Sequence, residues 1–312
     1  MPVNNSPRDS ESGRVSDPAI RALTVEDLAD AFALSTTAGW NQQLNDWRLL
    51  LRIGHAGAFA AVIDGRVVGT AIGIDYGGFA WIAMMLVDPR YRGRGLGRRL
   101  LETAMHSLPP ARRIRLDATP LGRPLYERYG FEVEATLSRH VSDGSNRGIA
   151  PAPDACGDVQ PLTAADLDTV IEQDQRTFGG TRGAVVEWAF HAAPRYAYTV
   201  RGETGVVQYC LGREGRLFDQ IGPVVAGDGR AASALVAAAL NAAGNRRVGV
   251  DVFDSHTAFP AWLQQRGFVV ERPLIRMCRA AQSAAPRNRG GESAPDSDRR
   301  GNEFAIFGPE FG

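Results

Sequence analysis

Short apolar segments separated by tight-turn signals dominate the first half of the sequence. Ala58–Ile63, Val67–Asp75 and Phe79–Val87 are apolar runs of strand length, separated by the turn pairs Asp64-Gly65 and Gly77-Gly78. Three strands joined in this way form an antiparallel meander. The apolar spacing around the meander predicts strands at Ile20–Leu23, Ile114–Ala118 and Phe131–Leu137 and helices at Val25–Thr37, Leu44–Ile53, Gly95–Ser107 and Pro124–Tyr129.

The second half repeats this order of elements in a weaker form. Each half ends with a helix closed by a Gly-Phe pair, Gly130-Phe131 in the first and Gly267-Phe268 in the second. The repetition suggests an internal duplication. The second half is predicted to contain strands at Val159–Leu162, Tyr196–Val200, Val206–Arg213, Leu217–Val225, Val248–Val252 and Phe268–Met277, and helices at Ala164–Thr177, Gly229–Ala243 and Phe259–Arg266.

These elements predict an α+β fold in two similar domains, each with a mixed, mostly antiparallel and twisted sheet flanked by helices. Polar, Pro-rich and Gly-rich stretches mark the boundaries between them. The apolar run Phe304–Phe307 favours docking of a final strand on a sheet edge, and closure of an active site by that segment is the alternative. We expect a disordered N-terminus at 1–17, a first domain at 18–142, a linker at 143–157, a second domain at 158–279, a flexible segment at 280–302 and a C-terminal strand at 303–312.

Composition limits the functions that fit this fold. The 35 basic and 35 acidic residues cancel, so nothing indicates a nucleic-acid or membrane partner. The chain contains no lysine, which excludes a Schiff-base lysine and the lysine of a nucleotide phosphate loop. Its three cysteines lie far apart without metal-ligand spacing, so we expect a reducing compartment and no metal. A polar start and the absence of an apolar run of about 20 residues predict a cytoplasmic protein.

The most specific chemical signal is a loop rich in glycine and arginine after the third meander strand. Residues Arg92-Gly93-Arg94-Gly95-Leu96-Gly97 follow an apolar strand and lead into a helix. Helix starts present unpaired amides with partial positive charge, and glycines allow a phosphate to approach the backbone. Five arginines within residues 90–99 add charge that can pair with phosphate oxygens. The loop therefore predicts a pyrophosphate site.

Three classes of pyrophosphate ligand can be compared. A nucleoside-triphosphate loop needs Gly-Lys-Ser/Thr, which a chain without lysine cannot supply. A dinucleotide site needs G-x-G-x-x-G directly after a strand, whereas the glycines here are spaced G-x-G-x-G. Asp117 stands where a ribose-binding acid would lie, but the preceding antiparallel meander argues against a dinucleotide fold. The third class is coenzyme A.

The loop resembles the Q/R-x-x-G-x-G/A motif of the GCN5-related N-acetyltransferase superfamily. The lead-in Val87-Asp88-Pro89 and the downstream run from Leu125 to Phe131 match that family as well, and the order of elements agrees over residues 19–140. The resemblance implies an enzyme that uses acetyl-CoA as co-substrate, without a metal, to acetylate an amine by direct attack in a ternary complex. The acceptor would be a small-molecule or peptide amine of unknown identity, and the oligomeric state is not predicted.

Family membership also implies roles for particular residues. The loop would hold the pyrophosphate, and the preceding strand would pair through its backbone with the pantetheine arm. A gap between this strand and Ile114–Ala118 would admit the cofactor. Thr119 stands near an asparagine of many members and could make the same contact through its hydroxyl. The implied cofactor-binding residues are Met85, Leu86, Val87, Arg92, Gly93, Arg94, Gly95, Leu96, Gly97, Arg98 and Thr119.

Catalysis requires an acid for the leaving thiolate and a polarised thioester carbonyl. Tyr126 lies where the family commonly places the acid, and Tyr129 could substitute for it. A backbone N–H near Val87 is the expected polarising group. Asp75, Asp88 and Asp117 lie near strand ends, but the first two are better explained as turn residues and no residue pattern identifies a base. None of the histidines stands in a diagnostic cluster. The family resemblance also allows water-mediated deprotonation of the amine without a single base. A CoA-binding sensor without catalysis is therefore the alternative function.

The corresponding loop of the second half lacks the features of a pyrophosphate site. Gly227-Asp228-Gly229 carries an acid where the first half has arginines, and Trp262 stands where Tyr126 stands. An aspartate would repel a pyrophosphate. We therefore expect a degenerate second domain that does not bind acyl-CoA but could shape the acceptor pocket. Its aromatic residues could line that pocket, although core packing is the favoured role for each of them: Trp188, Phe190, Tyr196, Tyr198 and Trp262.

Overall fold

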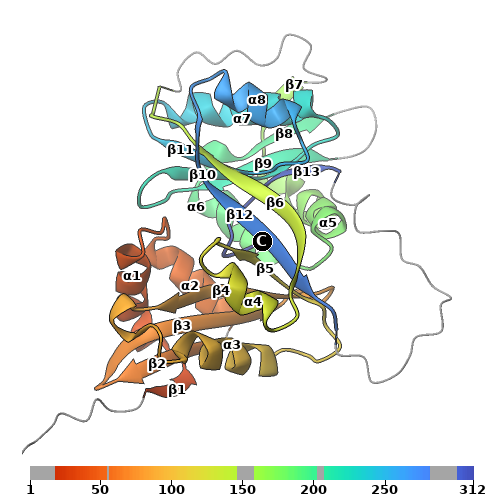
Figure 1. Ribbon diagram of the computed structural model, residues 1–312. Helices are drawn as coiled ribbons and strands as arrows, with labels where there is room; N and C mark the ends of the chain where they lie inside the picture. Colours follow the sequence, from red (N-terminus) through yellow and green to blue (C-terminus); the bar gives the residue numbers. More distant parts are fainter. Residues whose placement is uncertain (1–17, 55, 146–157, 202–206, 282–300) are drawn as a thin grey trace, which may run out of the picture.

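Strands from both halves of the chain form one continuous sheet (Figure 1). The structure, a computed structural model, describes residues 18–54, 56–145, 158–201, 207–281 and 301–312. The expected disorder at 1–17, most of the linker at 143–157 and most of the flexible segment at 280–302 lie outside these residues. In the described part the sheet has 13 strands in the order β1-β2-β3-β4-β5-β12-β6-β11-β13-β10-β9-β8-β7. The predicted mixed, mostly antiparallel sheet flanked by helices is confirmed.

The first half follows the sequence expectation closely. The strand pattern reproduces the meander, since β2, β3 and β4 pair antiparallel in chain order. The last strand continues beyond the predicted Leu137, because it pairs there with a strand of the second half. The elements are β1 (Ala19–Ala22), α1 (Leu28–Thr37), α2 (Leu44–Ile53), β2 (Ala58–Ile63), β3 (Arg66–Asp75), β4 (Ala80–Val87), α3 (Leu96–His106), β5 (Ile114–Ala118), α4 (Arg123–Glu127) and β6 (Glu132–Val141).

The second half contains one helix that the sequence pattern did not predict, α6. Its sequence is apolar on nearly all sides and begins without a capping side chain, so it shows no amphipathic period. The elements are β7 (Asp158–Pro161), α5 (Leu167–Phe178), α6 (Gly183–Ala192), β8 (Tyr198–Arg201), β9 (Gln208–Arg213), β10 (Asp219–Val225), α7 (Gly229–Ala243), β11 (Val248–Phe253), α8 (Ala258–Gln264), β12 (Val269–Arg279) and β13 (Glu303–Ile306).

The two halves exchange strands at the centre of the sheet. Strand β12 of the second half lies between β5 and β6 of the first, and β6 in turn pairs with β11. Buried ion pairs cross both junctions: Arg276 contacts Asp117 at 2.8 Å and Arg139 contacts Asp251 at 2.7 Å. Each half therefore completes its sheet with a strand from the other.

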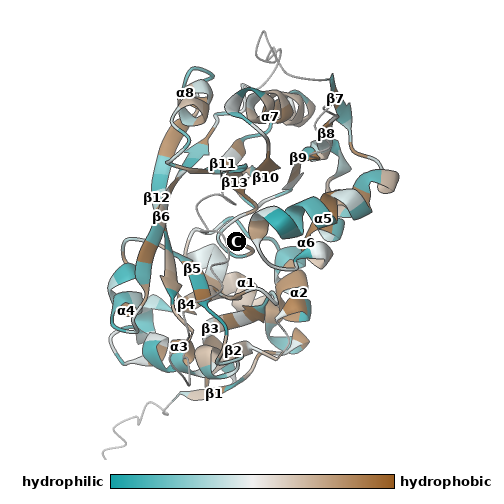
Figure 2. Ribbon diagram, turned by 90° about the vertical axis from the view of Figure 1, so that its right-hand side faces the viewer, coloured by the Kyte–Doolittle hydropathy of each residue, from teal (hydrophilic) through white to brown (hydrophobic). Residues whose placement is uncertain are grey.

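Helices cover both faces of the sheet and form a core shared by the halves (Figure 2). In β3 the neighbours Ala71 and Ile72 belong to different buried clusters, as the alternation of a strand requires. Helices α1 and α2 pack on one face, and α3 packs on the other. Val170 of α5 and Val185 of α6 join the same buried cluster as Trp47 of α2. The second half thus packs against the helices of the first.

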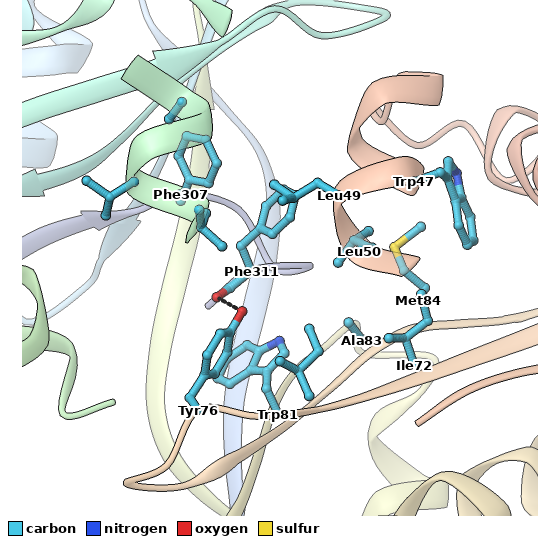
Figure 3. Close-up of a cluster of buried hydrophobic side chains, with 14 of the residues drawn as sticks. Trp47, Leu49, Leu50, Ile72, Tyr76, Trp81, Ala83, Met84, Phe307 and Phe311 are labelled. Carbon is cyan, nitrogen blue, oxygen red and sulfur yellow. Dashed lines mark hydrogen bonds between the residues drawn. The ribbon is translucent and has the colours of Figure 1, made fainter. Parts of the chain in front are cut away.

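The C-terminal segment, residues 301–312, lies inside the molecule. Strand β13 does not dock on a sheet edge as the sequence favoured but lies between β10 and β11, antiparallel to both. Beyond it, Phe307 and Phe311 enter the core of the first half (Figure 3). Tyr76 Oη donates to the carbonyl of Phe311 at 3.0 Å, and Trp81 Nε1 donates to that of Pro309 at 3.2 Å. The segment therefore ties the second half to β4 of the first.

Candidate active site

Strands β4 and β5 diverge and leave a gap in the sheet. They pair in parallel only at Ala80–Trp81 with Ile114–Arg115. Beyond these residues the strands separate, and β4 continues to Val87 at the start of the glycine-rich loop. A gap at this position is what the sequence analysis expected as the entry for the cofactor.

A β-bulge lies in β4 along this gap. Ile72 pairs with Ala83 and Thr70 with Leu86, so two residues, Met84 and Met85, stand opposite one on β3. Met84 has a φ of 51°, which a residue with a large side chain rarely adopts. Its carbonyl accepts a 2.7 Å hydrogen bond from Thr70 Oγ1. The bulge interrupts the regular pairing of β4 with β3 shortly before Val87, near which the sequence analysis placed the polarising N–H.

The glycine-rich loop presents its backbone to open space. Gly93 and Gly95 have φ values of 76° and 77°, and a Cβ built on either would meet no atom within 4 Å. Gly95 caps α3, whose first amides have no partner inside the helix. The buried positions Leu96 and Leu100 fix this helix on the sheet. Glycine is thus required here by backbone conformation, and the space above it is free for a ligand.

The arginines of the loop divide into two groups. Arg90 pairs with Asp88, which also accepts from the Arg90 backbone N–H at 2.9 Å; these bonds lower the pKa of Asp88 and identify it as a turn residue. Arg92, Arg94 and Arg98 are exposed. Arg92 Nε also donates to the Val87 carbonyl at 3.1 Å. The exposed arginines can add charge around the helix start.

A pocket lies in the gap between β4 and β5. Met84 and Met85 of the bulge line one side, and Thr119 and Tyr126 line the other. Three residues predicted as site residues, Met85, Thr119 and Tyr126, are thereby brought together. Leu86 and Val87 belong to the adjoining stretch of β4 and do not line this pocket.

Tyr126 and Tyr129 differ in their surroundings. Tyr126 is buried, and its ring packs edge-on against Phe131 at 5.9 Å. Burial raises the pKa of Tyr126, so its hydroxyl stays protonated at neutral pH and can donate a proton. Tyr129 Oη donates to Glu102 Oε1 at 2.5 Å on α3 and does not line the pocket. Of the two, the geometry favours Tyr126 as the acid.

Comparison with known proteins identifies the family of the chain. Residues 54–133 match one model of an acetyltransferase (GNAT) domain, and residues 170–290 match a second. The chain belongs to the GNAT acetyltransferase family.

Its relatives are distant. It is 28% identical over 169 residues to a holothin acyltransferase of Pseudoalteromonas sp., covering 54% of this chain and 55% of that protein, so it spans about half the length of this curated relative. It is 24% identical to the N-acetyltransferase YitH of Bacillus subtilis, which is uncharacterised, over 79% of this chain and 86% of that protein. A tandem GNAT protein from the clavulanic acid biosynthesis pathway has a similar fold, with a TM-score of 0.60, 16% identity and coverage of 86% of this chain and 100% of that one.

The carboxylates that the sequence offered as bases are engaged elsewhere in this GNAT protein. Asp117 accepts two hydrogen bonds from Arg276, at 2.8 and 2.9 Å. Asp75 accepts from the backbone N–H of Gly77 at 2.9 Å and is a turn residue. No described histidine lines the pocket. None of these groups is free to accept a proton in the gap.

Residues far apart in the sequence complete the pocket. Gln42 from the turn before α2, Arg272 of β12 and Glu310 of the C-terminal segment all line it. Sequence reasoning missed all three, since no local motif marks them. The aromatic residues proposed as its lining do not contact it among the described residues and pack in the cores instead: Trp188, Phe190, Tyr196, Tyr198 and Trp262.

Glu310 belongs to a buried charge network behind the pocket. Arg213 of β9 pairs with Asp46 of α2 at 2.8 Å and with Glu310. Burial and the charge of Glu310 raise the pKa of Asp46 to about 6, although Arg213 opposes the shift. Two carboxylates share one guanidinium, so this wall has an excess of negative charge.

The second half fills the equivalent positions with its own atoms. Asp228 caps α7, and its carboxylate accepts from the amides of Arg230 and Ala231 at 3.0 and 2.9 Å. Strands β10 and β11 diverge after Ile221, as β4 and β5 do, but β13 occupies the space between them. In the second half, the first amides of α7 are therefore bonded to Asp228, and β13 fills the gap between β10 and β11.

Two further properties concern the described residues. They contain no group of three or more His, Cys, Asp or Glu side chains arranged to hold a metal ion. None of their helices combines the length and the apolar character needed to cross a bilayer.

Proposed function

We propose that the first half binds acetyl-CoA and transfers its acetyl group to the amine of a small molecule or peptide. One observation supports the proposal: Met84 of the bulge and Tyr126 line one pocket, and β4 leads from this bulge into the glycine-rich loop with its open helix start at Gly95. The loop amides from Gly93 to Arg98 would hold the pyrophosphate. The β4 backbone at Met85, Leu86 and Val87 would pair with the pantetheine arm, and Thr119 would contact it from β5.

The chemistry follows from these positions. The neutral amine nitrogen attacks the thioester carbonyl carbon, forming the C–N bond while the C–S bond breaks. A backbone N–H at the Met84 bulge stabilises the developing oxyanion. Tyr126 gives its proton to the leaving thiolate, and the proton released from the amine restores the hydroxyl. The products are an N-acetylated acceptor and free CoA.

The second half is proposed to bind no acyl-CoA. Support comes from Asp228, which satisfies the α7 amides, and from β13, which fills the strand gap. Isothermal titration should therefore find one acetyl-CoA per chain. Two sites per chain would contradict this proposal.

Replacement of Gly95 by valine tests the first site. A valine with a φ of 77° is strained, and its side chain would extend into the space where the pyrophosphate is expected. We expect acetyl-CoA affinity to fall at least tenfold. Gly65→Val is the matched control, because Gly65 has the same φ of 77° and equally open surroundings in the distant β2–β3 turn. Equal affinities of the two variants would refute the proposed site, whereas tight binding without turnover of any amine would indicate a CoA sensor.

A further inference from the structure

Three buried polar atoms of residues that line the pocket have no hydrogen-bond partner among the described residues. Glu310 Oε2 and Gln42 Oε1 are buried and meet no hydrogen-bond donor among the described residues. Arg272 Nε is equally buried and meets no acceptor there. The side chains of Glu310 and Gln42 are 2% and 5% exposed, so water does not satisfy them freely. Buried polar groups are costly when unpaired, so three around one pocket indicate a ligand.

The charges of these groups are complementary to two different parts of a ligand. Arg272 forms no ion pair with any residue of the described ranges, and burial together with Arg139 lowers its pKa. The charges of Asp251, Glu271 and Glu310 oppose that shift. Glu310 lines the same pocket and shares Arg213 with Asp46 behind it, so these three groups together carry an excess of negative charge. The pocket is thus lined by a guanidinium without an ion pair among the described residues and by a carboxylate from a network with excess negative charge.

We propose that the acetyl acceptor is an amine that carries its own anionic group, as an amino acid does. Its amino group would bind as an ammonium to Glu310 Oε2 and Gln42 Oε1 and pass one proton to Glu310 before the neutral amine attacks. Its anion would be bound by the Arg272 guanidinium. These contacts would satisfy the Glu310 oxygen that Arg213 leaves unbonded and the guanidinium of Arg272. The inference rests on the proposed acetyl transfer in the same pocket and adds the class of acceptor.

The C-terminal segment thereby acquires a role in the active site. Figure 3 shows Phe311 near Tyr76 and Trp81, with Phe307 farther along the segment in the same buried cluster, and Glu310 lies between the two phenylalanines in the chain. This anchoring holds the backbone of Glu310 through the bond from Trp81 to Pro309 and that from Tyr76 to Phe311. The strand that closes the gap of the second half therefore leads directly to an acceptor-binding residue of the first.

Matched acceptor probes test the proposal. Release of free CoA thiol is measured with the twenty L-α-amino acids, β-alanine, taurine and phosphoethanolamine, and with the corresponding methyl esters or simple alkylamines that lack the anion. We expect turnover with at least one anionic amine and a value of kcat/KM at least tenfold lower for its uncharged counterpart. Absence of turnover with every anionic amine, in protein that binds acetyl-CoA, would overturn the proposal. Failure to bind acetyl-CoA would overturn the proposed function instead.

Single-residue variants test which pocket residue binds the ammonium end of the acceptor and which binds its anionic end. Arg272→Gln should lower kcat/KM for the anionic amine at least tenfold but leave the ester analogue nearly unchanged. Gln42→Leu and Glu310→Gln should each lower kcat/KM for both the anionic amine and its ester. If Glu310→Gln does not fold, Gln42→Leu still tests the ammonium site, because it leaves the Arg213 network intact. Arg176→Gln and Glu172→Gln, which change an exposed pair on α5, are the controls. Loss of ester turnover in Arg272→Gln equal to the loss with the anionic amine would refute the assignment.

Discussion

Tyr126 combines a buried ring with the hydroxyl that we propose as the acid, and its replacement by phenylalanine separates the effects of the two. The ring and its contact with Phe131 are kept, while the proton donor is lost. We expect kcat to fall about 10²-fold, the usual contribution of a general acid, with little change in acetyl-CoA affinity. Steady-state kinetics and calorimetry on the variant measure both quantities.

Tyr129→Phe is the matched control for this change. It removes only a hydrogen bond to Glu102 on the helix surface, so kcat should stay close to that of the parent. An equal loss in the two variants would show that neither hydroxyl is the specific donor.

Asp46 should make the free energy of unfolding decrease as pH rises, which is the opposite of the usual effect of a carboxylate. Its folded pKa of about 6 lies above its ordinary value of 3.8, so the folded protein binds a proton that the unfolded chain releases. The free energy of unfolding should therefore decrease as pH rises from about 4 to about 6 and then level off, by about 3 kcal/mol. Arg213 lowers the pKa of Asp46 and Glu310 raises it, so the value of about 6 already contains the effects of both neighbouring charges.

Urea unfolding between pH 4 and 7 measures this dependence. Asp46→Asn should remove it while keeping an oxygen that can accept from the Gln43 amide. Asp168→Asn, on the exposed face of α5, should leave the profile unchanged. A parent and an Asp46→Asn variant with parallel profiles would contradict the assignment.

The residues that line the pocket form two groups, one from a single stretch of sequence and one from distant parts of the chain. Met85, Thr119 and Tyr126 come from one stretch around the glycine-rich loop, and the family resemblance of that stretch was enough to select residues that line one pocket, although their roles stay predictions. Gln42 and Glu310 come from opposite ends of the chain. Their chemistry depends on burial beside Arg213 and on a missing partner, neither of which can be read from a linear pattern.

At the scale of elements, local signals predicted helices and strands but not their irregularities. Helix α2 agrees with prediction because its apolar period lies within ten consecutive residues and its capping residues directly flank them. The bulge at Met84 depends on how β4 pairs with β3, and sequence alone does not give that register. Helix α6 was missed because packing against α5 and β9 stabilises it, not an amphipathic pattern.

The C-terminal segment should contribute strongly to stability through its aromatic anchors. Phe307 is fully buried and contacts Trp188 and Phe311, with ring centroids 6.2 and 5.3 Å away. Phe307→Ala should cost about 3–5 kcal/mol in the free energy of unfolding, since it removes a large side chain and leaves a cavity. Leu121→Ala, at a position 82% exposed, should change it by less than about 0.5 kcal/mol. Urea denaturation compares the two, and similar values would show that the segment is not part of the core.

For the whole molecule, the repeat predicted two similar folds but not the exchange of strands between them. The Gly-Phe pair occurs in both halves, as Gly130-Phe131 before β6 and as Gly267-Phe268 before β12, so these two strands are equivalent elements. Each of these strands could form its backbone hydrogen bonds with strands of its own half. The pattern of apolar and polar residues therefore does not determine which strand it pairs with. Buried pairs such as Arg276–Asp117 and Arg139–Asp251 select the exchanged arrangement, because each leaves an uncompensated charge if the halves separate.

The exchange implies that the first half cannot fold alone. A fragment of residues 1–157 would expose the edge of β5 and bury Asp117 without Arg276, a loss of about 3–5 kcal/mol for that pair alone. We expect this fragment to be unfolded or aggregated and to bind no acetyl-CoA, and co-expression with residues 158–312 to restore binding. The full chain should unfold in a single transition followed by both circular dichroism and tryptophan fluorescence. An isolated first fragment that bound acetyl-CoA as tightly as the full chain would show that β12 is dispensable for the site, and that the continuous sheet does not couple the two halves.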